Sequence, residues 1–200
     1  MDEDAVAVVE GLERALSDSG LTQADFAAAL GTSAPRFSAY RAGKTMPSAA
    51  FFVRAQRLAS GLTAARDRGW MTPQSTAKAI SRAARSGDDL WALKMALQAR
   101  DQLRELLRTD DPAVVAWSAA PRSTGDRRWD ALLAALARHE FERAGRESLR
   151  WAARSSLRLG ADEEWTLRSL LLDDDEVRAA TPVWLAEYGV YAAERDLVTA

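Results

Sequence analysis

Residues 21–48 read LTQADFAAALGTSAPRFSAYRAGKTMPS, and this stretch decides the fold of the N-terminal part of the chain. Thr22 is suited to cap a first helix, and Gly31 follows its apolar stripe where a left-handed residue ends a helix. Ser33 can cap a second helix, and Pro35 falls in its first turn, where a missing N–H leaves nothing unpaired. The stretch therefore predicts two short helices around a tight turn, the geometry that places a second helix in the major groove of DNA.

The same stretch closely resembles the helix-turn-helix of the Cro/repressor (XRE-like) family. The resemblance covers about residues 9–60, and its elements recur in order without insertion. The matching features are the LTQ opening at residues 21–23, Leu30-Gly31, Ser33, Phe37, Tyr40, Gly43 and Pro47-Ser48. This resemblance implies that the chain binds double-stranded operator DNA and represses transcription.

Residues in and around the second helix take groove-facing or phosphate-facing positions by this resemblance. Gln23 is expected to contact a phosphate and to brace the second helix. Arg36 has the only long hydrogen-bonding side chain among the groove-facing positions, so it is the candidate for base readout or a close phosphate contact. Arg41 and Lys44 are expected to act mainly on phosphates. The predicted DNA-binding set is Gln23, Thr32, Ser33, Ala34, Pro35, Arg36, Ser38, Ala39, Arg41, Lys44 and Thr45.

The second helix departs from the family at three reading positions, where long polar side chains are common. Here these positions hold Ala34, Pro35 and Ala39, which can touch thymine methyls but cannot form bidentate hydrogen bonds. Such a helix should not find one operator alone, so we expect a homodimer on an inverted repeat. The alternative is a monomer whose C-terminal domain adds DNA contacts through Arg82, Arg85, Arg100, Arg104 and Arg108.

The charge distribution supports a single surface that faces phosphate. The net charge is −2, which alone argues weakly against a nucleic-acid partner. Residues 32–68, however, carry seven basic residues and one acid, whereas residues 1–31 carry seven acids and one basic residue. Residues 162–200 carry ten acids and three basic residues. A basic stretch between acidic ends is typical of one DNA-facing surface on a protein that otherwise repels DNA.

Composition restricts the compartment and the chemistry. The chain of 200 residues has no cysteine, which excludes a disulfide framework, a thiolate metal site and a cysteine nucleophile. No apolar run approaches membrane-spanning length, and the acidic start MDEDAVAVVE has the wrong sign for a signal peptide. We therefore expect a cytoplasmic protein that makes no membrane contact.

The whole chain is predicted to be all-α, with a repressor-type helix-turn-helix domain followed by a helical C-terminal domain. The predicted ranges are a DNA-binding domain over 1–68, a connector or start of the C-terminal domain over 69–120, and the C-terminal domain over 126–200, with PRSTGD at 121–126 as linker. Helices are expected over residues 3–18, 48–59, 72–87, 89–107, 112–117 and 127–145, with shorter ones beginning near residues 173 and 181. Residues 145–172 fit either helix or irregular wrap, and strands are scarcely signalled. An apolar stripe on the 89–107 helix comprises Leu90, Leu93, Leu97, Leu103, Leu106 and Leu107.

No catalytic constellation is predicted, and neither a metal nor a cofactor is expected, so we do not expect an enzyme. His139 is the only histidine and is interpreted as a surface residue of a helix. The acidic run Asp173–Glu176 lacks the glycine and ligand alternation of a calcium loop, and acids are favoured at a helix N-terminus in any case.

The C-terminal two-thirds also resembles small actinobacterial helix-turn-helix proteins, which are typically encoded beside AbiEii-type nucleotidyltransferase toxins. The similar segments are ALKMALQARDQLREL, STGDRRWDALLAALARHEFER and TPVWLAEYGVYAAERDLVTA. The chain departs from that group around residues 148–172, which are not proline-rich here. The resemblance implies an antitoxin that represses its own operon and binds a nucleotidyltransferase-type toxin. The alternative is a stand-alone or phage-type immunity repressor whose C-terminal domain oligomerises or adds DNA contacts.

Aromatic residues are concentrated in the C-terminal part of the chain. Six of the seven tryptophans follow residue 90. Buried aromatics provide much of the apolar area in cores and in interfaces alike, so both core filling and a partner-binding groove remain open. The acidic balance of residues 162–200 would attract a basic partner such as a nucleotide-handling enzyme. The partner-binding candidates are Trp165, Trp184, Tyr188 and Tyr191.

Overall fold

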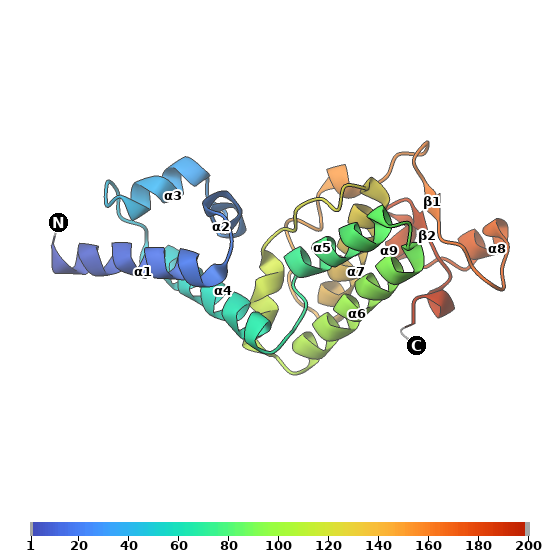
Figure 1. Cartoon of the computed structure of the whole chain (residues 1–200), viewed down its shortest axis with the longest axis horizontal. Coiled ribbons are helices and arrows are strands. Elements are labelled where there is room, and N and C mark those ends of the chain that lie inside the picture. Colours follow the sequence, from blue (N-terminus) through green and yellow to red (C-terminus); the bar gives the residue numbers. More distant parts are fainter. Residues whose placement is uncertain (1, 199–200) are drawn as a thin grey trace. The chain divides into compact units, whose positions relative to one another are not determined.

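The computed structural model describes residues 2–198, and nearly all of its regular structure is helical (Figure 1). The all-α prediction is confirmed. Contacts divide the chain into two compact units. Unit 1 contains the residues up to Pro73 together with Asp110–Ala120, and unit 2 contains Gln74–Thr109 together with the residues from Pro121 onward. No helix within residues 2–198 is both long enough and apolar enough to cross a membrane.

Unit 1 begins with four α-helices, each of which starts at a short polar side chain. They are α1 (Glu3–Ser19), α2 (Gln23–Ala29), α3 (Ala34–Arg41) and α4 (Ala49–Asp67). The capping side chains accept hydrogen bonds from backbone N–H groups of the first turn, which would otherwise be unpaired. These capping residues are Asp2, Thr22, Ser33 and Ser48. Local sequence signals therefore set where all four helices begin.

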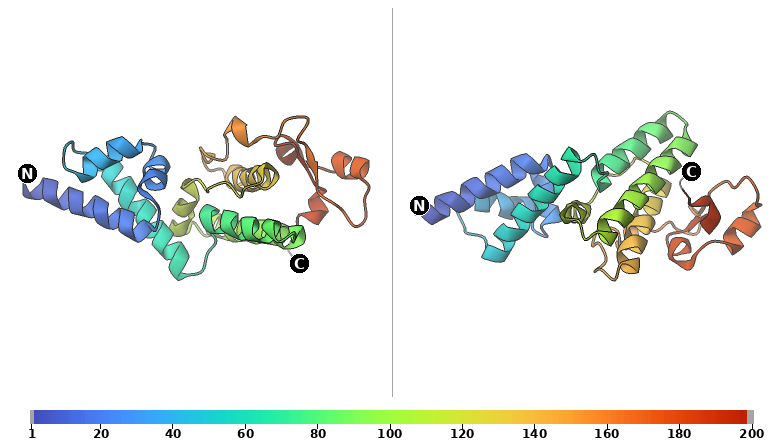
Figure 2. Two further views of the ribbon diagram at one scale, coloured as in Figure 1. Left: turned by 45° about the horizontal axis from the view of Figure 1, so that its top comes forward. Right: turned by 90° about the horizontal axis from the view of Figure 1, so that it is seen from below.

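The core of unit 1 lies between α1, α4 and the α2–α3 pair. Helices α1 and α4 pack side by side along their lengths (Figure 2). Phe26 of α2 and Phe37 of α3 are fully buried, and their rings meet edge to face with centroids 5.5 Å apart. Tyr40 and Phe51 continue this aromatic cluster, with centroids 5.1 Å apart. The cluster fixes α3 against α4, so its outer face is held in a defined direction.

A returning segment completes unit 1. The 3-10 helix η1 (Pro112–Ser118) packs on α4 at Gly61, where an added Cβ would lie 2.2 Å from Val115 Cγ1. Arg68 at the end of α4 donates two hydrogen bonds to Asp111, of 2.5 and 2.7 Å. This guanidinium, with the backbone N–H of Ala113, holds the pKa of Asp111 below its usual range.

The expected domain ranges of 1–68, 69–120 and 126–200 differ from the two units. The segment 69–120 is not one connector, because its residues 74–109 belong to unit 2 and its residues 110–120 belong to unit 1. The physical reason is that η1 packs closely against α4 at Gly61, where the helix has no side chain. That contact joins residues far apart in the sequence, and composition alone does not signal it.

Unit 2 is built around three long helices. These are α5 (Pro73–Arg85), α6 (Asp89–Arg108) and α7 (Arg127–Arg143), and α6 packs against α7 (Figure 2). Every residue of α7 from 131 to 137 is buried, so this helix is the centre of the unit. The apolar stripe of α6 is confirmed at Leu97, Leu103, Leu106 and Leu107 but is wrong at Leu90, which is 80% exposed. Leu90 lies in the first turn of α6.

The last third of unit 2 is an irregular wrap with short elements. It contains η2 (Ser155–Leu157), α8 (Asp174–Ala179), α9 (Val183–Ala186) and η3 (Glu194–Asp196). Strands β1 (Trp165–Thr166) and β2 (Val190–Tyr191) pair in parallel, with Trp165 opposite Val190. Of the two alternatives for residues 145–172, the irregular one is correct. The two-residue strands could not be anticipated, because two residues are too few to show alternation.

Candidate nucleic-acid interface

The turn between α2 and α3 is closed by backbone hydrogen bonds around a left-handed glycine. Gly31 has φ of 75°, a conformation that costs little only without a Cβ. Its N–H donates to Ala28 O at 3.0 Å, and the N–H of Thr32 donates to Ala27 O at 2.9 Å. Ser33 then accepts from the N–H of Arg36 at 3.3 Å and starts α3. Each signal expected from the sequence is therefore present in the geometry of this turn.

Gln23 links the start of α2 to both ends of α3. Its Nε2 donates to the carbonyl of Ala34 at 3.4 Å, and its Oε1 accepts from the guanidinium of Arg41. These contacts fit the expected role of Gln23 as a brace of the second helix. The expected contact of Gln23 with a phosphate stays a prediction.

Arg41 is held inside unit 1 rather than extended from it. Its Nε and Nη2 donate to the two carboxylate oxygens of Glu13 on α1, at 2.8 and 2.6 Å. A phosphate would therefore have to share Arg41 with a carboxylate and with Gln23. The sequence did not indicate this ion pair, because Glu13 and Arg41 lie on helices that meet only in the folded unit. The role of Arg41 as a phosphate ligand stays a prediction, in competition with Glu13.

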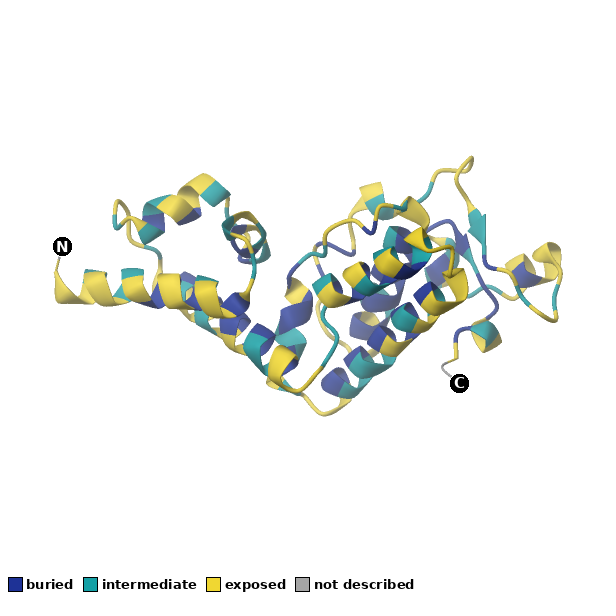
Figure 3. Ribbon diagram, viewed as in Figure 1, coloured by how far each residue is buried: buried dark blue, intermediate teal, exposed yellow. Residues whose placement is uncertain are grey.

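The outer face of α3 is exposed, as Figure 3 shows. Pro35, Arg36 and Ser38 are exposed, whereas the opposite face buries Phe37 and Tyr40. The remaining predicted positions lie on the same exposed side or at its edge. Exposed are Ser33, Lys44 and Thr45, and partly buried are Thr32, Ala34 and Ala39. The fold thus separates the candidate DNA-facing residues from the core residues of the same helix.

Arg36 leans along its own helix. Its Nε donates to the hydroxyl of Tyr40 at 2.6 Å, and its guanidinium carbon lies 5.7 Å from the centre of that ring. A guanidinium has five N–H donors, and this contact uses one of them. Spacing by four residues on a helix could have indicated the pair from the sequence. Tyr40 therefore orients the one long side chain on the outer face of α3.

Further positive charge lies on the loop after α3 and on α4. Lys44, Arg54 and Arg57 are exposed and form no ion pair among the described residues. Arg54 lies over the ring of Phe51, with its guanidinium carbon 6.0 Å from the ring centre. These three residues belong to the basic stretch 32–68. Arg41 and Arg68 are paired with carboxylates, whereas the charges of these three residues are not.

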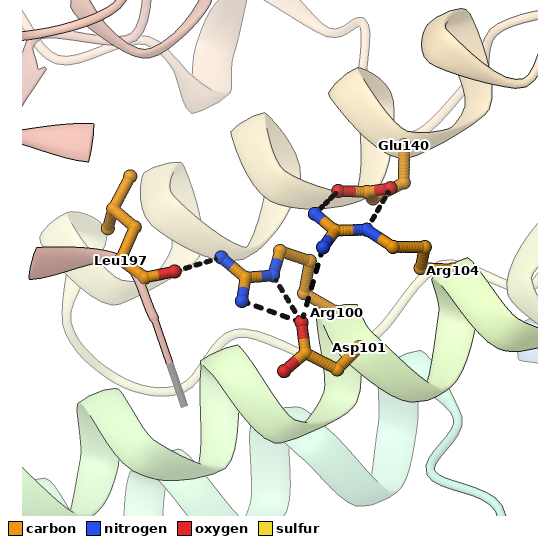
Figure 4. Close-up of polar contacts among 5 residues, drawn as sticks. All are labelled: Arg100, Asp101, Arg104, Glu140 and Leu197. Atoms are coloured by element: carbon orange, nitrogen blue, oxygen red, sulfur yellow. Dashed lines mark hydrogen bonds and ion pairs between the residues drawn. The ribbon is translucent and has the colours of Figure 1, made fainter. Parts of the chain in front are cut away.

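The arginines of unit 2 that were considered for DNA binding are mostly engaged inside that unit (Figure 4). Arg100 is buried, pairs with Asp101 at 2.6 Å, and donates to the carbonyl of Leu197. Arg104 donates two hydrogen bonds to the buried Glu140, at 3.0 and 2.6 Å, which raise its pKa. Arg108 pairs with Glu105 at 2.6 Å. Arg82 and Arg85 are exposed.

The expectation that all five arginines could serve as DNA ligands is therefore corrected for the buried Arg100 and for Arg104. Both side chains hold α6 to other parts of unit 2. A phosphate could reach the buried Arg100 only after that packing opens, and it would have to share the partly exposed Arg104 with Glu140. The sequence pattern showed arginines at helical spacing, but it showed neither the contact of Arg100 with Leu197 nor that of Arg104 with Glu140 on α7.

The four partner-binding candidates divide between core and surface. Tyr188 is 1% exposed, and its hydroxyl donates to the carbonyl of Ala152 at 2.8 Å, so it is a core residue and not an interface residue. Burial raises the pKa of this hydroxyl. Trp165 is partly buried and meets Trp129 edge to face, with centroids 4.8 Å apart. The prediction that Tyr188 binds a partner is therefore wrong, because the surrounding residues bury its side chain.

Trp184 and Tyr191 remain partly accessible. Trp184 of α9 stacks on His139 of α7, with ring centroids 4.2 Å apart and planes 14° from parallel. Tyr191 donates to Glu164 at 2.8 Å and lies under the guanidinium of Arg178, 4.0 Å away. The hydrogen bond to Glu164 raises the pKa of Tyr191, and Arg178 lowers the pKa of Glu164.

A shallow cavity of about 380 Å³ lies beside the stacked pair His139 and Trp184. Arg138 in its wall is paired with Glu142 and Glu187, at 2.6 and 3.2 Å. His139 is partly buried, which lowers its pKa, so the interpretation as a plain surface histidine is incomplete. The stack with Trp184 joins residues 45 positions apart and gave no sequence signal.

The acidic run Asp173–Glu176 serves as a helix cap. The Asp173 carboxylate accepts from the N–H of Glu176 at 2.9 Å, and the Glu176 carboxylate accepts from the N–H of Asp173 at 3.0 Å. This reciprocal pair is a capping box, with the remaining acids in the first turn of α8. Within residues 2–198, no group of three or more His, Asp or Glu side chains is arranged to hold a metal ion.

Comparison with known proteins adds no family assignment. No protein-family model, no curated protein and no solved structure matches this chain significantly.

Proposed function

We propose that this protein is a sequence-specific DNA-binding transcriptional repressor that places α3 in the major groove of its operator. The observation that carries the proposal is the arrangement of α3 itself. Gln23 braces both ends of the helix, Phe37 and Tyr40 fix its inner face, and its outer face is exposed. A rigid helix with one free face and adjacent unpaired cations is what groove recognition requires.

The exposed side chains divide into two kinds of DNA contact. Pro35, Ser38 and the partly exposed alanines are small, so they allow close approach to the groove and contact with thymine methyls. Arg36, oriented by Tyr40, is the residue that reads guanine or contacts a nearby phosphate. Lys44 neutralises phosphate without regard to sequence.

The experiment compares Arg36→Ala with Lys44→Ala on an operator selected from random DNA by the full-length protein. If Arg36 reads guanine, its loss should weaken operator binding by about 1–3 kcal/mol and relax selection at one base pair. Loss of Lys44 should weaken binding to all sequences alike and reduce the salt slope by about 1. Arg168→Ala, an exposed arginine of unit 2, is the matched control. Full-affinity binding by Arg36→Ala would refute its assignment, and failure of the wild-type protein to select any sequence would refute the function.

Assembly on DNA is the second element of the proposal. Because α3 offers one long side chain, one copy recognises few base pairs, and two copies on an inverted repeat supply the missing specificity. Light scattering of the protein–operator complex should give two chains per site. One chain per site would refute the dimer and favour extra contacts from the exposed Arg82 and Arg85.

We further propose that unit 2 binds a cognate toxin of the nucleotidyltransferase type, so that the repressor acts as an antitoxin. The support is the resemblance of residues 90–200 and the acidic balance of residues 162–200. The test is co-purification of the full-length chain with the product of the adjacent gene. If that product does not bind, the chain is a stand-alone or phage-type repressor instead. Deletion of residues 162–200 is unsuitable as a test, because Tyr188, Val190 and Leu197 belong to the core.

A further inference from the structure

Two adjacent leucines project from unit 2 without covering any core. Leu170 is 94% exposed and Leu171 is 77% exposed, in the loop of residues 168–173 that leads into α8. Figure 3 shows this loop and α8 as largely exposed. Single exposed apolar residues are common on proteins, but two adjacent leucines this exposed form a contiguous apolar tip.

The loop is held at both of its ends. Leu167 before it is buried, and its N–H donates to the carbonyl of Tyr191 at 2.8 Å. Ser169 Oγ accepts from the N–H of Leu171 at 3.3 Å, which turns the chain at the leucines. After the loop, the capping box of Asp173 and Glu176 starts α8.

Helix α8 is in turn fixed to the β1–β2 ladder. Arg178 of α8 pairs with Glu164 at 2.9 Å and stacks on Tyr191, and Val177 is fully buried. The leucines therefore project from a loop whose two ends are anchored. A preorganised loop loses less conformational entropy on binding than a flexible one.

The charge around the leucines restricts what can bind them. Residues 168–176 carry four acids and one basic residue, the exposed Arg168. Asp174 and Asp175 are exposed and form no ion pair among the described residues. Four carboxylates repel phosphate, which argues against nucleic acid and against a membrane of anionic lipid. They attract a protein surface that carries Lys and Arg.

We propose that residues 169–175 form a docking surface for a second, basic protein. This docking loop comprises the leucines, the residues beside them and the first two residues of α8. Leu170 and Leu171 enter an apolar cleft of the partner, and Asp174 and Asp175 face Lys or Arg side chains at its rim. Apolar contacts supply most of the stability of the complex, and the carboxylates raise the rate of association. This inference rests on the proposed partner-binding role of unit 2, for which it names the contact surface.

The experiment measures binding of the purified adjacent gene product to full-length variants. The double variant Leu170→Ser/Leu171→Ser should weaken the affinity at least about tenfold, mainly through faster dissociation. Asp174→Asn/Asp175→Asn should lower the association rate several-fold at low salt and little at high salt. Asp173 and Glu176 are left intact because they cap α8. The control is Leu90→Ser, which alters another exposed apolar residue of unit 2 outside the loop.

The outcomes separate the loop from the broader proposal. If the adjacent gene product binds the leucine variant as tightly as the wild type, the docking loop is refuted and the partner-binding role stands. If it binds no form of the chain, the partner-binding role fails and the docking loop fails with it. If the leucine variant instead abolishes self-association in sedimentation, the occupant is a second copy, which overturns the assignment to a basic partner.

Discussion

The α2–α3 pair of unit 1 and the last third of unit 2 are held together by interactions of different range. In the pair, Thr22 and Ser33 cap their own helices, and the brace from Gln23 spans at most 18 residues. In the last third, residues 145–198, the hydrogen bond from Tyr188 to Ala152 spans 36 residues and that from Arg100 to Leu197 spans 97. In the first region the caps and the turn form from neighbouring residues, and its longest side-chain contact, Arg41 to Glu13, spans 28 residues. The second region depends on contacts that close only when the whole unit folds.

This difference implies different responses to substitution. A change within α2–α3 should disturb the packing of α3 while unit 2 keeps its structure. A change at one of the long-range contacts should loosen the wrap over α7 as a whole, because each contact closes a long loop.

The largest effect is expected from Phe37→Ala. This side chain is fully buried between Phe26 and Phe51, so its removal should destabilise unit 1 by about 3–5 kcal/mol. Hydrogen exchange should show lost protection in α1–α4 and unchanged protection in α7. Loss of protection throughout both units would contradict their separate folding. Pro35→Ala, on the exposed face of the same helix, is the control.

Gly61→Ala tests whether residues 110–120 belong to unit 1. An alanine normally stabilises a helix interior relative to glycine, but here its Cβ would lie 2.2 Å from Val115 and 3.2 Å from the carbonyl of Pro112. We expect a loss of about 1–3 kcal/mol, measured by denaturant unfolding. Ser60→Ala, at an exposed position of α4, should be close to neutral. A stabilised Gly61→Ala variant would show that η1 does not pack there.

Tyr188→Phe tests a long-range contact of unit 2. The substitution removes one hydroxyl and leaves the carbonyl of Ala152 without this donor in a buried place, at an expected loss of about 1–2 kcal/mol. Tyr191→Phe is the matched control, because its hydroxyl bonds to the exposed Glu164 and should matter less. Equal losses in the two variants would contradict the assignment of Tyr188 to the core.

The smallest effect concerns pH. Partial burial lowers the pKa of His139 below its ordinary 6.5, so the unfolded chain takes up this proton first as the pH falls. The contribution of neutral His139 to stability is therefore complete at pH values above the ordinary pKa of 6.5 and decreases as the pH falls below it. Thermal midpoints should fall more between about pH 7.5 and about pH 5.5 in the wild type than in His139→Gln. Identical pH profiles would show that protonation of His139 is not coupled to folding.

The sequence was sufficient for features whose partners lie within one or two turns. Caps at Thr22, Ser33 and Ser48, the left-handed Gly31 and the starts of α5, α6 and α7 all follow from local chemistry. The inner face of α3 followed from the spacing of Phe37 and Tyr40 by three residues, which leaves the opposite face exposed. For these elements the cause and the structure lie in the same stretch of chain.

Other features depended on residues that meet only in the fold. The ion pair of Arg41 with Glu13, the burial of Arg100 and Tyr188, and the stack of His139 on Trp184 leave no periodic trace. A run of arginines looks the same whether it faces phosphate or a buried carboxylate. The candidate site residues could therefore be placed on α3 from the sequence. Which of their charges are paired with carboxylates could not be predicted.

The divided path of unit 1 has a consequence for synthesis on the ribosome. Helix α4 is made long before η1, which covers it at Gly61, and the whole of α5 and α6 is translated in between. At about 5–20 residues per second, the interval between residues 73 and 120 lasts about 2–10 s. During that time the nascent helices α1–α4 lack the segment η1 that packs on α4. Unit 1 can therefore complete its fold only after residue 120 has been made, although its four α-helices end at residue 67.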